Sequence, residues 1–151
     1  MAVITSPEAM EEDYSSSTDN AVSAVFSILL TFGNNLSPKE RDEGLTFVLQ
    51  YLPMREDVDE AQDVHERFVE QLMMPNHGIL NNSKYLDAAM HLLPLLLLPT
   101  YDDGDNEFEV VYPETKQTVI NALKQMSPND VNRLLRQEEP EVKAFIMQQL
   151  Q

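Results

Sequence analysis

The sequence contains no cysteine and no tryptophan, and it has only four glycines. Without cysteine the chain can form no disulfide, no thiol nucleophile and no cysteine-ligated zinc site. The few glycines leave little room for phosphate-binding loops, and no glycine-rich nucleotide-binding pattern occurs. The most apolar stretch, residues 88–99, contains His91 and Pro94 and is shorter than the roughly 20 residues of a membrane span. We expect a protein without a membrane anchor or a nucleotide site.

Basic residues are also scarce. The sequence has 10 lysines and arginines and 26 acidic residues, which gives a formal net charge of −16. This balance argues against nucleic acid and against anionic membranes as partners, since both are bound through clustered basic side chains. An acidic surface instead attracts basic proteins and speeds their association. The same acidity also serves simply to keep a protein soluble, and composition alone leaves both interpretations open.

Hydrophobic residues make up 42% of the 151 residues, which suits one globular domain. Residues 1–17 differ from the rest, because they combine four acidic residues with the run Ser15-Ser16-Ser17 and offer little apolar surface. The sequence predicts a disordered acidic tail over residues 1–17 and a folded module over residues 18–151. The first basic residue is Lys39, so the beginning lacks the positive region of a signal peptide.

Apolar residues recur at spacings of three and four from Thr18 onward, which is typical of amphipathic helices. In the first predicted helix these apolar residues are Val22, Val25, Phe26, Leu29 and Phe32. Gly33-Asn34 then ends the helix as a C-terminal cap would. The predicted helices cover about residues 18–32, 38–52, 57–74, 83–98, 113–126, 128–135 and 140–150.

Several of these helices carry recognisable start signals. Ser37 with Glu40 forms a capping box around Pro38, and Asp57 with Glu60 repeats the spacing. Ser83 is predicted to cap the fourth helix, which we expect to reach about Leu98. Pro94 should bend that helix, because proline cannot donate the backbone hydrogen bond.

The spacing of the helices predicts an all-α fold built from helical hairpins. One pair runs over residues 38–74 and the next over residues 83–126, so each unit has roughly the 40-residue length of HEAT and armadillo repeats. A plain antiparallel helix bundle remains the competing interpretation. Between these elements, residues 99–112 form an acidic loop without a basic residue, in which the alternation over 107–112 permits a short extended piece.

The sequence offers little that resembles a catalytic or metal site. The three histidines, His65, His77 and His91, lack the i, i+4 spacing of a helical metal site, so structural or solvent-facing roles are expected. The stretch 102–107 is rich in acids around Gly104, but counting from that glycine places Pro99 and Val110 where a calcium loop needs acidic ligands. We therefore expect no enzyme activity, no cofactor and no metal.

Four short blocks resemble the C-terminal HEAT repeats of nuclear import receptors of the importin-beta family. Residues 19–25 resemble the family's D-N-A-x-S-A-x helix start, and residues 52–61 its L-P-L-x-x-D-x-x-E-A turn. Asn81-Asn82 and the segment Met126-Ser127-Pro128 match two further positions in the same order. The blocks span most of the chain from Asp19 onward, and the closest branch is the importin beta three type, which carries ribosomal proteins and histones.

The resemblance implies a cargo-binding role in the cytoplasm and nucleus, with basic import signals, ribosomal proteins or histones as partners. In this family the second helix of each hairpin lines the concave surface, which here is the helix over residues 57–74. The implied cargo-binding residues are Asp59, Asp63, Glu66, Glu70, Asp102, Asp103 and Asp105.

The family's receptors are several times longer than this chain, and their Ran contacts lie largely in earlier repeats. Binding of Ran is therefore implied only if upstream repeats are present. The helix that begins at Asp19 matches an inner helix without its outer partner, so it should leave apolar surface uncovered. Two alternatives to transport stay open, namely a structural end cap of a helical solenoid and a free-standing acidic HEAT adaptor.

Overall fold

The computed structural model describes residues 15–151 of the chain. Residues 1–14 of the predicted tail over residues 1–17 lie outside the described residues, so the prediction of disorder there is not tested. The first helix, α1, spans Ser15–Phe32 and so begins three residues before the predicted start at Thr18. The serines of the predicted tail therefore belong to a helix.

Within the described residues the fold is all-α, with seven α-helices and one short hairpin, which confirms the predicted fold class. The further α-helices are α2 (Pro38–Tyr51), α3 (Val58–Met73), α4 (Ser83–Leu92), α5 (Pro113–Lys124), α6 (Pro128–Leu134) and α7 (Pro140–Gln149). Three 3-10 helices connect or extend them: η3 (Gly33–Asn35), η4 (Gly78–Leu80) and η5 (Leu93–Leu97). Strands β1 (Thr100–Tyr101) and β2 (Glu107–Phe108) pair antiparallel. No helix of residues 15–151 is long and apolar enough to cross a membrane.

Most of the predicted helix starts are correct. The Ser37 hydroxyl accepts a hydrogen bond from the Glu40 N–H at 3.1 Å, and the Glu40 carboxylate accepts one from the Ser37 N–H at 3.3 Å. This reciprocal pair is the capping box, and it satisfies N–H groups that have no partner inside the helix. Asp57 likewise caps α3 by accepting from the Glu60 N–H at 3.1 Å.

The fourth helix differs from the prediction in two respects. Its cap is Asn82 rather than Ser83, because the Asn82 side-chain oxygen accepts from the Lys84 N–H at 2.9 Å. Its α-helical part ends at Leu92, and the chain continues as η5 rather than as a bent α-helix to Leu98. Pro94 accounts for the change, since its ring lacks the N–H that an α-helix needs and collides with the preceding turn.

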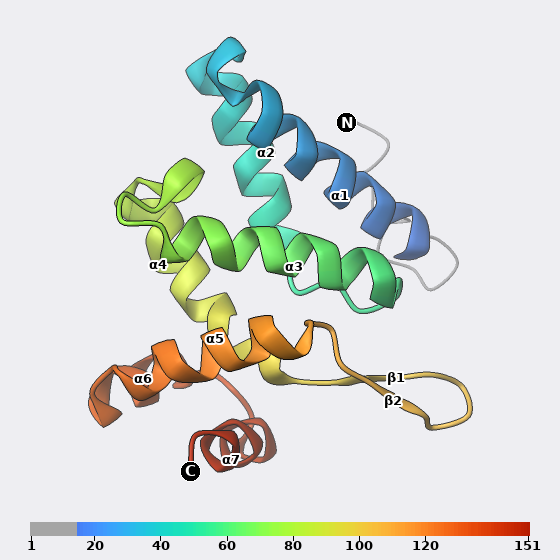
Figure 1. Cartoon of the computed structure of the whole chain (residues 1–151), viewed down its shortest axis with the longest axis vertical. Helices are drawn as coiled ribbons and strands as arrows, with labels where there is room; N and C mark the ends of the chain where they lie inside the picture. The colour runs from blue at the N-terminus through green and yellow to red at the C-terminus, as the bar shows by residue number, and fades with distance from the viewer. Residues whose placement is uncertain (1–14) are drawn as a thin grey trace.

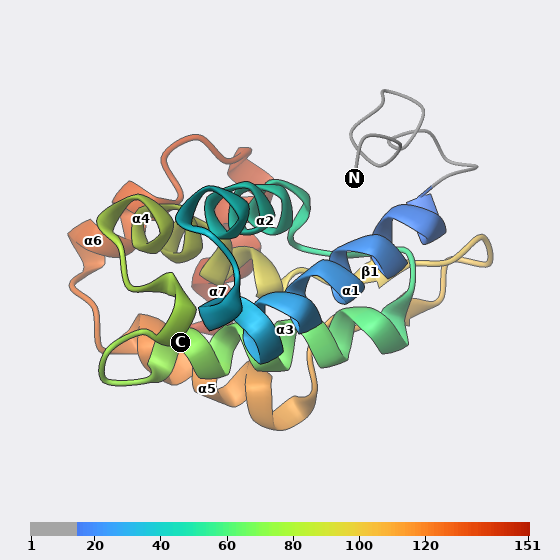
Figure 2. The same cartoon turned by 90° about the horizontal axis from the view of Figure 1, so that it is seen from above.

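The helices form two layers. Figure 1 shows α3 lying beside α1 and α5, and Figure 2, turned by 90°, shows these three helices on one side with α2 and α4 on the other. Contacts link α1 to α2 and to α3, α2 to α4, and α3 to α5. This arrangement is compatible with a helical repeat fold.

The leucine-rich segment supplies the centre of the core. Leu93, Leu96 and Leu97 of η5 are buried, and η5 contacts α4, α5 and α7. Phe26 of α1 and Phe68 of α3 are fully buried between their helices. Removing a buried phenylalanine side chain from a core costs about 3–5 kcal/mol, so both residues contribute strongly to the stability of the fold.

Helix α1 leaves part of its apolar surface exposed. Phe32, the last apolar residue predicted for the first helix, is 53% exposed, and Ile28 one turn earlier is 48% exposed. Val22, Phe26 and Leu29 on the other side of α1 are buried. The reason is that α1 packs on α2 and α3 through one face only. The expectation that this helix leaves apolar surface uncovered is correct.

Candidate functional site

Helix α3 presents a row of acidic side chains to solvent. Its buried residues are Ala61, Val64, His65, Phe68, Val69 and Leu72, and this packing turns the opposite side outward. Asp59, Asp63 and Glu70 are exposed and Glu66 is partly buried. Their spacings of four, three and four residues place all four on one side of the helix. We call these four residues the α3 acidic face.

A tyrosine from the segment after the hairpin lies against the α3 acidic face. The Tyr112 hydroxyl donates a hydrogen bond to the Asp63 carboxylate. This bond, followed by burial and by the nearby carboxylates of Asp63, Glu66 and Asp59, raises the pKa of Tyr112 to about 12. The phenol therefore stays neutral and a donor at physiological pH. Sequence analysis missed Tyr112, because it follows Asp63 by 49 residues and carries no local signal.

The basic residues near the α3 acidic face are engaged elsewhere. Arg67 turns toward α1, where its guanidinium donates to the Ser27 hydroxyl at 2.8 Å and lies 6.0 Å from the Phe26 ring centre. Lys116 pairs with Glu109 at 2.7 Å. Among residues 15–151, no lysine or arginine forms an ion pair with any of the four acids. Their negative charge is therefore not neutralised within the described part of the chain.

The second predicted group, Asp102, Asp103 and Asp105, lies at the tip of the β1–β2 hairpin. The Asp102 carboxylate accepts from the N–H groups of Gly104 and Asn106, each at 2.9 Å, and from the Asn106 side chain at 3.0 Å. These bonds, led by that of the Asn106 side chain, lower the pKa of Asp102. Asp102 therefore builds the turn, whereas the carboxylates of Asp103 and Asp105 are exposed.

The base of the hairpin is attached to α3, but its tip projects away from the helices (Figure 1). The Gln62 side chain donates to the Glu109 carbonyl oxygen at 3.1 Å, and His65 bonds to the Val110 carbonyl oxygen. No hydrogen bond of the described residues joins Asp102, Asp103 or Asp105 to α3. The structure thus brings together the four acids of α3 and keeps the hairpin acids as a separate group.

His65 is a fully buried part of the core. Its Nε2 accepts from the Met54 N–H at 3.0 Å, so Nδ1 must carry the proton that is donated to the Val110 oxygen at 2.7 Å. Burial lowers the pKa of His65 to about 4, with a smaller contribution from the Arg55 charge. His65 thus joins the turn before α3 to the segment after the hairpin, in agreement with the expected structural role.

The other two histidines, His77 and His91, form hydrogen bonds within their own segments. His77 and His91 each bond through Nδ1 to a carbonyl oxygen of their own segment, at 2.8 Å from Leu72 and Asp87 respectively. Across the range 15–151, no three histidine, aspartate or glutamate side chains are grouped so that they could hold a metal ion. The α3 acidic face thus presents four carboxylates on one side of a helix.

The fold and the site together describe an all-α protein with an acidic helix face. No protein-family model matches the sequence, and no curated protein or solved structure matches it either.

Proposed function

We propose that the α3 acidic face binds a segment of a basic protein. The observation that carries this proposal is the row Asp59, Asp63, Glu66 and Glu70, which lies on one side of a helix without a cationic partner among residues 15–151. A ligand rich in lysine and arginine would supply the missing countercharges.

The spacing of the row adds a physical reason for such a ligand. Asp59 with Asp63, and Glu66 with Glu70, are like charges four residues apart, which destabilises a helix by roughly 0.2–0.5 kcal/mol per pair. A bound cation relieves this repulsion, so part of the binding free energy comes from the helix itself. Tyr112 extends the surface beside Asp63, and its ring offers a face on which an arginine can stack.

The biological role that we propose is cargo binding by the C-terminal part of a nuclear transport receptor. The resemblance of four sequence blocks to importin-beta receptors supports it, as does a layered helical fold compatible with a helical repeat. The expected cargo is a basic import signal, a ribosomal protein or a histone, met in the cytoplasm and released in the nucleus. Binding to Ran is expected only when further repeats precede this segment.

A pull-down with an immobilised lysine- and arginine-rich peptide tests the proposal. The site variant combines Asp63→Asn, Glu66→Gln and Glu70→Gln, which remove charge but keep side-chain size. The control variant combines Glu43→Gln, Glu139→Gln and Glu141→Gln, which removes the same charge from exposed positions outside α3. We expect the site variant to lose the peptide and the control to retain it, and equal retention by both would refute the assignment.

A structural role for the C-terminal helix is the second candidate. Ile146 of α7 is fully buried and α7 contacts η5, while Glu141 and Gln148 face solvent. A helix with one apolar and one polar side suits the cap of a helical solenoid. Truncation from Glu139 should then cause unfolding or aggregation, whereas a truncated chain that stays folded would argue against a capping role.

A further inference from the structure

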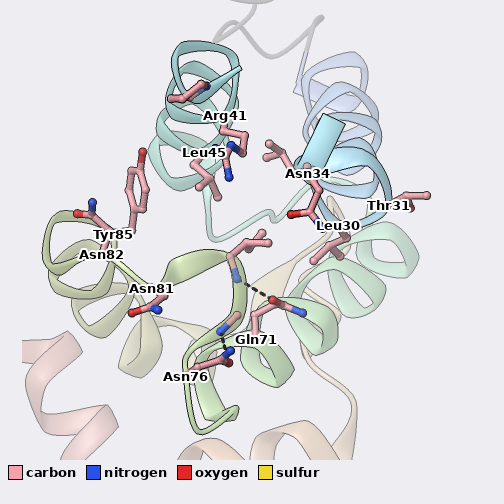
Figure 3. Close-up of a pocket in the computed structure, with 15 residues that line it drawn as sticks. Leu30, Thr31, Asn34, Arg41, Leu45, Gln71, Asn76, Asn81, Asn82 and Tyr85 are labelled. Atoms are coloured by element: carbon pink, nitrogen blue, oxygen red, sulfur yellow. Dashed lines mark hydrogen bonds between the residues drawn. The ribbon is translucent and has the colours of Figure 1, made fainter. Parts of the chain in front are cut away.

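A pocket of about 550 Å³ lies at the opposite end of α3 from Asp59. It is open to solvent and is lined by the end of α1 with η3, the first turns of α2, the end of α3 with η4, and the start of α4. Figure 3 shows Arg41 reaching from α2 toward the hollow, with Tyr85 and Asn82 on one side and Asn34 and Leu30 on the other. Its volume falls in the usual range for ligand pockets.

The charge of this pocket is opposite to that of the protein as a whole. In a chain with a net charge of −16, the lining contains one arginine, Arg41, and no aspartate or glutamate. Asp42 accepts hydrogen bonds from the hydroxyl of the lining Tyr85 and from the Lys84 ammonium, but it is not itself a lining residue. The Arg41 side chain is exposed to solvent, and its guanidinium forms no hydrogen bond or ion pair with another side chain of residues 15–151, although its charge acts on the lining Tyr85. The pocket therefore suits an anionic group.

Five carboxamide side chains line the same pocket, and their oxygens are largely occupied. The Gln71 oxygen accepts from the Ile79 N–H at 3.0 Å, the Asn76 oxygen from the Gly78 N–H at 3.0 Å, and the Asn82 oxygen from the Lys84 N–H at 2.9 Å. The amide NH₂ groups of these three residues have no partner in the described range. Asn34 and Asn81 also line the pocket without a side-chain bond in that range. The lining thus offers an excess of N–H donors.

An apolar strip completes the lining through Leu29, Leu30, Leu45 and Ile79. Positive charge, surplus donors and an apolar strip together match a ligand with a carboxylate, several carbonyl oxygens and an aliphatic side chain. We propose that this pocket binds the C-terminal end of a peptide, with the terminal carboxylate at Arg41 and the main-chain carbonyls at the carboxamides. This site is independent of the α3 acidic face.

The test is a titration of the full chain, labelled with ¹⁵N, with N-acetyl-leucyl-leucine as the free acid. We expect saturable shifts of the amides of Gly33, Ile79 and Asn82 at millimolar ligand. Arg41 is exposed, and an exposed ion pair contributes little to binding, so the C-terminal amide of the same dipeptide should bind roughly two- to five-fold more weakly. Sodium acetate at the same concentration should produce much smaller shifts.

Two matched variants distinguish a specific contact with Arg41 from a general effect of losing one positive charge. Arg41→Gln should weaken binding of the free dipeptide roughly two- to five-fold, whereas Lys39→Gln, which removes the same charge from another exposed residue two positions away, should not. The absence of saturable shifts, equal binding of acid and amide, or equal loss in both variants would overturn the proposal. Shifts of full size with acetate would show a simple anion effect and would overturn it too.

Discussion

The carboxylate of Asp19 on α1 accepts a hydrogen bond from the backbone N–H of Asp57, with 2.9 Å between Oδ2 and N. The same oxygen accepts from the Glu56 N–H at 3.1 Å. Asp19 is only 7% exposed, and its burial outweighs these bonds and raises its pKa. The contact attaches the first helix to the turn that starts α3, and thereby fixes the helix that carries the acidic face.

The first prediction concerns the two hydrogen bonds that the Asp19 carboxylate accepts from the backbone before α3. Asp19→Ala should lower the free energy of unfolding by about 2 kcal/mol, because two N–H groups lose their acceptor in a buried place. Asp19→Asn should cost less, because its amide oxygen can still accept and burial disfavours the charge. Urea unfolding measures both, with the exposed Asp103→Asn as control. A larger loss in the asparagine variant than in the alanine variant would contradict this description.

The second prediction concerns how the free energy of unfolding depends on pH. A histidine in the unfolded chain takes up a proton near pH 6.5, whereas the pKa of His65 in the folded protein is about 4. As the pH falls through this window the unfolded state binds the proton first, so the stability is complete above pH 6.5 and declines toward pH 4. The decline from this group should reach about 3 kcal/mol.

Two histidine variants test whether His65 causes this loss of stability at low pH. Free energies of unfolding measured between pH 7 and pH 4 should fall less steeply for His65→Gln than for the natural sequence. His91→Gln, at an exposed position on α4, should retain the natural slope. If removing His65 leaves the slope unchanged, another group is responsible for the acid sensitivity.

The third prediction concerns the turn between α3 and α4. Gly78 has a φ of 52°, and a Cβ there would lie 1.9 Å from the Gln71 side-chain oxygen. Gly78→Ala should therefore strain the backbone and break the Gln71–Ile79 bond, at a cost of about 2–4 kcal/mol. Gly33→Ala is the control, because a Cβ at Gly33 meets nothing within 4 Å. Thermal unfolding of both variants gives the comparison, and a stability of Gly78→Ala equal to that of the control would count against this geometry.

Local signals predicted the helices well. The caps at Ser37 and Asp57 act through atoms only three residues apart, so the local sequence contains the whole interaction. The cap of α4 was misassigned, because Asn82 and Ser83 are neighbours of equal capping ability and the choice between them depends on the preceding turn.

Long-range contacts could not be predicted in the same way. Asp19 is 38 residues from Asp57 in the sequence, and Tyr112 is 49 residues from Asp63. The pocket around Arg41 is built from four separate segments, none of which has a ligand-binding pattern of its own. The acids of α3 were placed correctly because helical periodicity alone determines which side they occupy. Their role in binding stays a prediction.

The most direct test of the central proposal is the affinity of a fluorescent lysine- and arginine-rich peptide, measured by anisotropy at low and at physiological salt. Each exposed ion pair contributes about 0.2–1 kcal/mol. The variant with Asp63→Asn, Glu66→Gln and Glu70→Gln should therefore bind roughly ten-fold more weakly than the variant with Glu43→Gln, Glu139→Gln and Glu141→Gln. The difference should shrink as salt screens the charges. Equal affinities of the two variants at low salt would contradict the assignment of the α3 acidic face as the binding surface.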